Sequence, residues 1–322
     1  MNRIVQSSTR LTLIVFVLVA GFASIARAAP SACPEHYPGG VSPDIVRPQL
    51  AAETYELCFR EFAVIYSGIS RTPLASAEHL TRDSVQSGRG LRREDVFHEE
   101  ERLPPDQRAR LGDYARSGFD RGHMAPSGDM STPEAQAESF SLANMVPQDP
   151  GSNRCLWEGV ESTVRDLAVR EGEVWVLTGP IFQGETLRRL DGRVLVPTSL
   201  YKAVYVPSRR EAAAYIAPNA PGMEWRIVSL AELRDLIGIN AFPSVPAELQ
   251  GRTMPLPEPR PHNVRGSCDR EGTAVTSHHP RAGRPARDTS TASAAGSYAS
   301  LIIEALVAIV ACFVLYRILG RR

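Results

Sequence analysis

Four consecutive residues, Asp120-Arg121-Gly122-His123, constrain this chain more than any other segment. They place a carboxylate, a fixed cation and an imidazole around a glycine that permits a tight backbone. Hydrolysis of a phosphodiester needs a base that deprotonates water and positive charge that stabilises the pentavalent phosphate. Because a run of this kind also occurs in surface turns with an incidental histidine, its meaning depends on the residues downstream of it.

A second segment, about thirty residues further along, supplies complementary groups. Residues 153–171 contain no proline, and apolar residues recur there at the spacing of an amphipathic helix: Leu156, Val160, Val164 and Leu167. Four further residues repeat at intervals of four and therefore share one helix face: Asn153, Trp157, Glu161 and Arg165. An amide, a carboxylate and a guanidinium on one face can hold a hydrated Mg²⁺ and a phosphate together, since Mg²⁺ keeps several of its waters. The alternative is an ordinary solvated helix face.

The ordered set of motifs resembles the DNA/RNA non-specific endonucleases of the ββα-metal (His-Me finger) class, which includes secreted bacterial nucleases and mitochondrial endonuclease G. The resemblance runs over roughly residues 55–245, and an ordered match in several parts is more specific than any single motif. It implies an α+β fold with a central antiparallel sheet flanked by helices. The matching pieces, in order, are Arg92-Arg93 before Phe97, Tyr114, Ser117 to His123, Asn144-x-x-Pro147-Gln148, Asn153-x-x-x-Trp157-x-x-x-Glu161-x-x-x-Arg165, Val174 to Pro180, Val196-Pro197 and Tyr201-Lys202.

The resemblance also implies a role for each matching residue. His123 is expected to be the general base that activates water. Asn153 is expected to be the one direct protein ligand of Mg²⁺ or Mn²⁺, and Glu161 to hold the water shell of the metal. Asp120 and Asn144 are expected to support the site by orienting His123 or the metal waters. The arginines expected to contact the scissile phosphate are Arg121 and Arg165, with Arg92 or Arg93.

Two departures from the family pattern flank Asn153. Ser152 precedes it where leucine is usual, and Arg154-Cys155 comes after it where glutamine and a small residue are common. Neither position carries a catalytic role, so we expect effects on fine geometry only. Gln148 is expected to be structural.

The implied function is hydrolysis of DNA and RNA phosphodiester bonds with one metal ion, leaving a 5′-phosphate end. The implied partners are both nucleic acids, contacted through their backbones, and a second copy of the chain in a homodimer. Alternatives are a catalytically degenerate module that only binds nucleic acid, a phosphodiesterase for small nucleotides, and a secreted toxin. Retention of His123, Asn153 and Glu161 favours the enzyme, because a binding module needs neither a base nor a metal ligand.

Charge and length fit one globular domain with tails. The chain has 322 residues and a formal net charge of zero, which argues against a protein that coats DNA and leaves room for a local basic groove. Nearly all the positive charge is arginine, and Lys202 is the only lysine. Arginine suits bidentate phosphate contacts, but we attribute the bias mainly to the base composition of the genome.

Both ends of the chain are predicted to carry segments that place the protein at the cell membrane. Arg3 and Arg10 precede an apolar run that ends in a small-x-small cleavage site at Ala26-Arg27-Ala28, so residues 1–28 are predicted to be a signal peptide; an uncleaved anchor is the alternative. Residues 297–317 are long enough for a transmembrane helix, and the basic residues 318–322 are predicted to stay in the cytoplasm. A processed sorting tail and a packed helix are the alternatives. The predicted location is the periplasmic or extracellular face of the cell membrane.

Cysteine usage agrees with export. Four cysteines lie in the exported part, and four allow three pairings. We expect the pairs Cys33–Cys58 and Cys155–Cys268, with free buried thiols as the alternative that an oxidising compartment disfavours.

The remaining pattern predicts one nuclease domain over residues 29–251 and a flexible linker over residues 252–296, which contains a solvated His278-His279 pair. Within the domain, the N-terminal arm is predicted to be extended and residues 81–118 to be mostly loop. Strands are predicted at 62–67 and 174–178, a strand pair at 194–196 and 203–206, and helices at 131–141 and 230–237.

Overall fold

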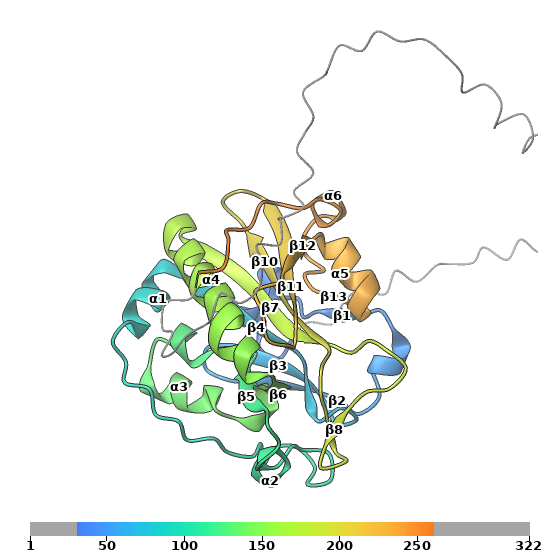
Figure 1. The fold of residues 1–322 in the computed structure, drawn as a ribbon. Coiled ribbons are helices and arrows are strands. Elements are labelled where there is room, and N and C mark those ends of the chain that lie inside the picture. Colours follow the sequence, from blue (N-terminus) through green and yellow to red (C-terminus); the bar gives the residue numbers. More distant parts are fainter. Residues whose placement is uncertain (1–30, 261–322) are drawn as a thin grey trace, which may run out of the picture. The chain divides into compact units, whose positions relative to one another are not determined.

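Seven antiparallel strands form the centre of residues 31–260, the part of the chain that the computed structural model describes (Figure 1). All six residues of β3 are buried, because both faces of the sheet are covered. The strand order is β12 (Arg226–Val228), β11 (Glu211–Pro218), β10 (Ser199–Val206), β7 (Glu173–Ile181), β4 (Thr72–Thr81), β3 (Phe62–Ser67) and β2 (Thr54–Cys58).

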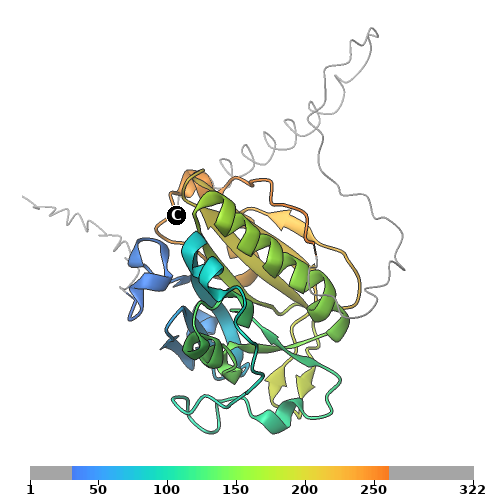
Figure 2. The ribbon, with the colours of Figure 1, turned by 90° about the vertical axis from the view of Figure 1, so that its left-hand side faces the viewer.

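Helices lie on both faces of this sheet. The long helix α4 (Glu158–Glu171) crosses one face beside α1 (Arg82–Gly88), as Figure 2 shows in light green and cyan. Its apolar side, including Val160 and Val164, packs on Val176 of β7 and Val204 of β10. On the opposite face, α5 (Leu230–Ile237) packs Leu230 and Leu233 against the sheet. We call the α4 side the front face and the α5 side the back face.

Short elements complete the described region. A two-stranded ribbon of β5 (Asp120–His123) and β6 (Met145–Gln148) lies on the front face, and a π-helical turn, η6 (Ser152–Trp157), leads into α4. The others are η1 (Pro34–His36), η2 (Pro38–Gly40), β1 (Asp44–Ile45), η3 (Pro48–Leu50), α2 (Leu111–Tyr114), η4 (Ser127–Asp129), α3 (Pro133–Ser139), η5 (Leu142–Asn144), β8 (Arg189–Leu190), β9 (Val194–Leu195), β13 (Ile239–Asn240) and α6 (Ala247–Gln250).

Local sequence sets the ends of two helices. A capping box starts α5, in which the Ser229 hydroxyl accepts from the Glu232 amide and the Glu232 carboxylate accepts from the Ser229 amide. The same helix ends at Gly238, whose φ of 74° lies in the left-handed region that glycine enters without a steric penalty. A second capping box, formed by Thr81 and Ser84, starts α1 directly after β4.

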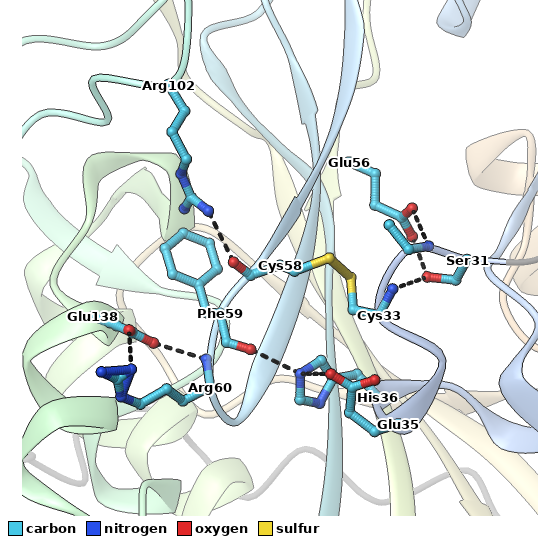
Figure 3. Close-up of a disulfide and its surroundings, with 11 residues drawn as sticks. Ser31, Cys33, Glu35, His36, Glu56, Cys58, Phe59, Arg60, Arg102 and Glu138 are labelled. Carbon is cyan, nitrogen blue, oxygen red and sulfur yellow. Dashed lines mark hydrogen bonds and ion pairs between the residues drawn. A yellow bond between two sulfur atoms is a disulfide. The ribbon is translucent and has the colours of Figure 1, made fainter.

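One predicted disulfide is present. Cys33 and Cys58 are bonded with their Cα atoms 5.6 Å apart, which ties the N-terminal arm to β2 (Figure 3). Glu56 accepts hydrogen bonds from Ser31 and Ala32, and the ring of buried His36 bonds the Phe59 carbonyl. Cys155 is also disulfide-bonded, but its predicted partner Cys268 lies outside the described residues.

Several sequence predictions are confirmed by this fold. The α+β class with a central antiparallel sheet is present. The predicted strand at 62–67 coincides with β3 and the predicted helix at 230–237 with α5, while the buried strand at 174–178 lies within β7. The predicted helix at 131–141 is shorter, at Pro133–Ser139.

Other predictions are wrong, for identifiable reasons. Residues 81–118 are mostly loop, as predicted, but the prediction missed the helices α1 and α2 within them. The N-terminal arm is not simply extended, since it folds into short 3-10 turns and pairs β1 with β13. Residues 194–196 do not pair with 203–206; β9 pairs with β8, and β10 pairs with β7 and β11.

The packed chain also continues past the predicted boundary at residue 251. Met254 and Leu256 are buried in the front-face core, and the Tyr215 hydroxyl donates to the Pro257 carbonyl. Within residues 31–260, no helix is long and apolar enough to span a bilayer. The predicted signal peptide, most of the predicted linker, the transmembrane helix and the basic tail lie outside the described residues.

Candidate active site

The ribbon of β5 and β6 fixes the backbone of the Asp-Arg-Gly-His run. The two strands pair antiparallel, with Asp120 opposite Gln148 and His123 opposite Met145. A Cβ atom on Gly122 would lie 2.0 Å from Oε1 of Gln148, so only glycine leaves room for the Gln148 side chain over this strand. Gln148 is therefore a packing partner of the run.

His123 lies at the end of β5 in an aromatic enclosure. Its side chain is 7% exposed, its ring meets that of Phe140 edge to face at 5.0 Å, and Phe97 lies 5.9 Å away. Its Nε2 atom has no hydrogen-bond partner among the described residues. A buried ring nitrogen without a partner can accept the proton of an incoming water.

Burial also sets the charge of this histidine. It lowers the pKa of His123 to about 3, and the nearby Arg93 adds to this effect because a second positive charge is unfavourable there. The imidazole is thus neutral at physiological pH. A general base must be in this form to accept a proton.

Asp120, at the start of β5, connects the ribbon to the turn that precedes α4. Its carboxylate accepts a hydrogen bond from Nδ2 of Asn153 at 3.0 Å and two from Arg154, at 2.9 and 2.7 Å. Because the Asn153 amide nitrogen faces Asp120, its oxygen is left as the atom that can bind a metal. Arg154, one of the two departures from the family pattern, is thereby the strongest partner of Asp120.

The π-helical turn affects the spacing of the predicted stripe. Residues four apart pass slightly beyond one full turn in an α-helix but fall slightly short of one in a wider π-helix. From Asn153 to Trp157 the π-helical turn rotates the stripe backwards around the helix axis, and from Trp157 to Glu161 the α-helix rotates it forwards. The two rotations nearly cancel, so Asn153 and Glu161 lie on the same side of the helix. Trp157, the aromatic member of the stripe, is fully buried and anchors the turn in the front-face core.

Glu161 and Arg165 lie further along, on α4. Burial raises the pKa of Glu161 to about 7, against the opposing charges of Lys202 and Arg165. Arg165 donates to Oδ1 of the buried Asp129 at 2.6 Å and to the Ser162 hydroxyl at 2.9 Å. A carboxylate and a guanidinium are thus held side by side on the helix that begins at the candidate metal ligand.

Asn144 has a structural task. It is fully buried; its Oδ1 accepts from Ser76 and from the Ala125 amide, and its Nδ2 donates to the carbonyls of Ala125 and Ser139. All its hydrogen-bonding capacity is used within the protein. It fixes the backbone of Ala125, two residues after His123.

The other predicted arginines lie around His123. The guanidinium of Arg121 stacks over Phe97 at 4.5 Å, and that of Arg93 lies 5.3 Å from the Phe140 ring centre while pairing with Asp95. Arg92 is exposed, and among residues 31–260 no hydrogen bond or ion pair ties it to the site. The aromatic residues that enclose His123 thus also support two of the predicted phosphate-binding cations.

The donor set suits a hydrated cation rather than a dehydrated one. The described residues contain no group of three or more His, Cys, Asp or Glu side chains placed to hold a metal. Asn153 offers one amide oxygen, and Glu161 a carboxylate two turns along the same helix. Mg²⁺ keeps several waters and needs few protein ligands, so these residues fit it.

Sequence reasoning missed several partners of these residues. Phe140 and Asp129 lie between the two motifs in sequence but belong to neither, and aromatic or acidic residues of this kind are common in any core or turn. Phe97 entered the sequence argument only as a marker of position. The contribution of all three depends on tertiary contacts, which no local pattern in the chain reveals.

A histidine on a two-stranded ribbon, joined to a helix that carries an asparagine and a glutamate, defines the ββα-metal nuclease fold. A sequence profile of the DNA/RNA non-specific endonucleases matches residues 42–248. The chain belongs to this family of nucleases, which are hydrolases.

Individual relatives agree. The chain is 39% identical over 173 residues to Nuclease C1 of Cunninghamella echinulata var. echinulata, covering 49% of this chain and 69% of that protein. It is 33% identical over 212 residues to the mitochondrial Nuclease EXOG of Homo sapiens, covering 58% and 56%. The crystal structure of the EndoG/EndoGI complex superposes with a TM-score of 0.53 at 28% identity over 57% of this chain and 84% of that chain. The chain thus spans little more than half the length of the human relative.

Proposed function

We propose that this protein is a metal-dependent endonuclease that hydrolyses the phosphodiester bonds of both DNA and RNA. The observation that carries the proposal is the neutral, buried His123 on the strand whose first residue, Asp120, orients Asn153. Family membership and the names of the relatives support nuclease activity in general.

His123 is the general base in this proposal. Water enters beside the free Nε2, which takes its proton as the oxygen attacks phosphorus. The aromatic enclosure holds the ring in one orientation and keeps it uncharged between turnovers. A positioned base of this kind contributes about 10²–10⁴ in rate.

The metal site consists of Asn153 as direct ligand and Glu161 as holder of metal-bound water. A bound Mg²⁺ or Mn²⁺ would stabilise the developing charge on the phosphate and on the leaving 3′ oxygen. The hydrogen bond to Asp120 uses the Asn153 amide nitrogen and so leaves the amide oxygen for a metal. The raised pKa of Glu161 means that a cation nearby favours its charged form, so binding and ionisation support each other.

Arginines bind the backbone of the substrate. Arg121 and Arg165, with Arg93 or Arg92, supply guanidinium groups to the scissile phosphate and its neighbours. Phosphate contacts fix the position of a nucleic acid and carry no sequence information, which fits cleavage without sequence preference.

Export and membrane attachment are part of the proposal. The predicted signal peptide and the predicted transmembrane helix at 297–317 would place the domain outside the cell membrane with a short cytoplasmic end. The Cys33–Cys58 disulfide supports an oxidising compartment. Fractionation of cells, followed by protease treatment of intact spheroplasts, tests this placement: digestion of the domain supports it, and protection contradicts it.

The first experiment compares the wild type with His123→Ala on supercoiled plasmid and on RNA, each with Mg²⁺ and with EDTA. We expect the wild type to cut both substrates only with metal. The variant should cut them about 10²–10⁴-fold more slowly. Similar cutting by the variant would remove His123 from the mechanism. Binding without cutting under several divalent metals would favour the non-catalytic binding module.

A further inference from the structure

Two opposite charges lie buried beneath α4, where the fold alone gives no reason for them. Glu78 in β4 and Lys202 in β10 both have fully buried side chains, with Lys202 Nζ 3.9 Å from Glu78 Oε2. The same ammonium donates to Thr178 Oγ1 in β7 at 2.8 Å. Removing two such groups from water is unfavourable for each ion, so a compensating role is expected.

Strand register places these groups on the front face. Lys202 is opposite Thr178, and Glu78 is opposite Val176, two residues away on the same side of β7. Leu80 and Val204, which lie two residues beyond the charges on their strands, pack in the core beneath α4. The two ions therefore lie in the apolar layer between the sheet and the helix that carries Glu161 and Arg165.

The choice of lysine at position 202 is itself informative. The chain has 36 lysine and arginine residues together, and Lys202 is the only lysine. The bias that favours arginine at the other basic positions therefore does not hold at position 202. An ammonium is compact and can donate in three directions, whereas a planar guanidinium needs more room and more acceptors.

Lys202 acts on Glu161 through charge. After burial, the positive charge of Lys202 has the largest effect on the pKa of Glu161, and it lowers that pKa more than Arg165 does. The ammonium thus faces Glu78 at 3.9 Å and also acts on Glu161 through its charge.

Glu78 acts on Arg165 through Asp129. Burial raises the pKa of Glu78 well above its usual range, and Asp129 adds to this by its charge and by a hydrogen bond between the carboxyl groups, while Lys202 opposes it. Within the described part of the chain, no N–H or hydroxyl group donates to either Glu78 oxygen or to Oδ2 of Asp129. A proton on Glu78 can therefore bridge to Asp129, whose other oxygen accepts from Arg165.

We propose that Glu78 and Lys202 are positioning residues for hydrolysis, in which Lys202 orients Glu161 and Glu78 orients Arg165 through Asp129. This inference rests on the proposed nuclease function. It differs from a purely structural role, in which the buried pair would fill the layer and any apolar pair of similar volume would serve equally well. Small displacements matter here, since a misplacement of about 1 Å can cost about 10²-fold in rate.

The test replaces both charges at once in the full chain, as Glu78→Leu/Lys202→Met. Apolar residues of similar volume often replace a buried ion pair without loss of stability. We expect the double variant to fold but to lose about 10–100-fold in kcat on plasmid, and about tenfold in affinity for Mn²⁺ measured by calorimetry without substrate. Leu177→Ala is the matched control, since its residue lies next to Thr178 on the back face; it should lower stability and leave both values unchanged per folded molecule.

A folded double variant with the kcat and Mn²⁺ affinity of the wild type would overturn the inference. If the double variant does not fold, Lys202→Met and Glu78→Gln decide. We then expect Lys202→Met to lower kcat at least about tenfold. Glu78→Gln should lower kcat much less, because the amide keeps the shape of the side chain and can donate to Asp129. Equal kcat values in the two single variants would overturn the inference. A wild type that does not cleave contradicts the proposed function instead, whereas a cleaving wild type with an equally active double variant contradicts only the positioning role.

Discussion

The two faces of the central sheet use the same strands for different purposes. On the back face, Ala75 and Ala77 of β4 pack with Leu177 of β7 in an apolar layer under α5. On the front face, the alternate residues Ser76 and Glu78 are buried and polar. Because successive side chains of a strand point to opposite sides, one strand can contribute to stability with one set of residues and to a polar site with the next. Substitutions on the two faces should therefore have separable effects.

The largest expected effect on stability comes from Asn144→Ala on the front face. Its loss leaves buried groups of Ser76, Ala125 and Ser139 without partners, and each such group costs about 1–3 kcal/mol. We expect a decrease of about 3–5 kcal/mol in the free energy of unfolding, together with lower activity, because Ala125 is close to His123. Urea unfolding and plasmid cleavage measure the two; wild-type activity in the folded variant would show that the turn does not position His123.

The next effect tests the back face alone. Leu177→Ala removes a fully buried side chain and should cost about 2–5 kcal/mol. The cleavage rate per folded molecule should stay at the wild-type value, as measured at a temperature where both proteins are folded. A fall of tenfold or more would mean that the faces are not separable.

A smaller effect comes from the lowered pKa of His123. The unfolded chain takes up a proton on this residue below about pH 6.5, whereas the folded protein does so only near the pKa of about 3. The unfolded state therefore binds more protons between these values, and stability is lost as pH falls through about 6.5. Glu161, with a pKa raised to about 7, has the opposite effect, since its folded form binds the extra proton.

Comparison with His123→Ala isolates the contribution of the histidine. When the pH is lowered from 7.5 to 5.5, the free energy of unfolding should decrease by about 1 kcal/mol more in the wild type than in the variant. Chemical denaturation at the two pH values measures this difference. Equal losses would indicate that His123 titrates normally in the folded protein.

The smallest effect is expected at Arg154, on the exposed edge of the front face. Its ion pair with Asp120 has good geometry, but its side chain is 69% exposed. Arg154→Ala should change the unfolding free energy by less than about 1 kcal/mol, as thermal denaturation can show. A larger decrease in the unfolding free energy would mean that the ion pair of Arg154 and Asp120 stabilises the β5–β6 ribbon in addition to orienting Asn153.

The sequence predicts those elements whose determinants are local. The apolar run of β3 and the cap and terminal glycine of α5 lie within a few residues of the structures they set. The ribbon residues Asp120 to His123 and the helix after Asn153 are likewise accessible from motif and spacing.

The features that the sequence does not predict depend on distant contacts. The pairing of β9 with β8 is decided by tertiary packing, since its short apolar run could join either neighbour. Asp129 meets Arg165 across 36 positions of sequence, and Glu78 meets Lys202 only because β7 lies between their strands. Such pairs are created by the fold, so the roles of their members could not be inferred from neighbouring residues.

The residues after α6 bear on how the enzyme can be shortened. Thr163 of α4 donates to the Glu258 carbonyl and accepts from the Arg260 amide, so the chain crosses the outer side of this helix before leaving the described region. A version ending at residue 251, where composition suggests the domain stops, would uncover apolar surface that Met254 and Leu256 now shield. A soluble form for crystallisation is therefore better trimmed after Cys268, which keeps the residues up to 260 and the predicted partner of Cys155.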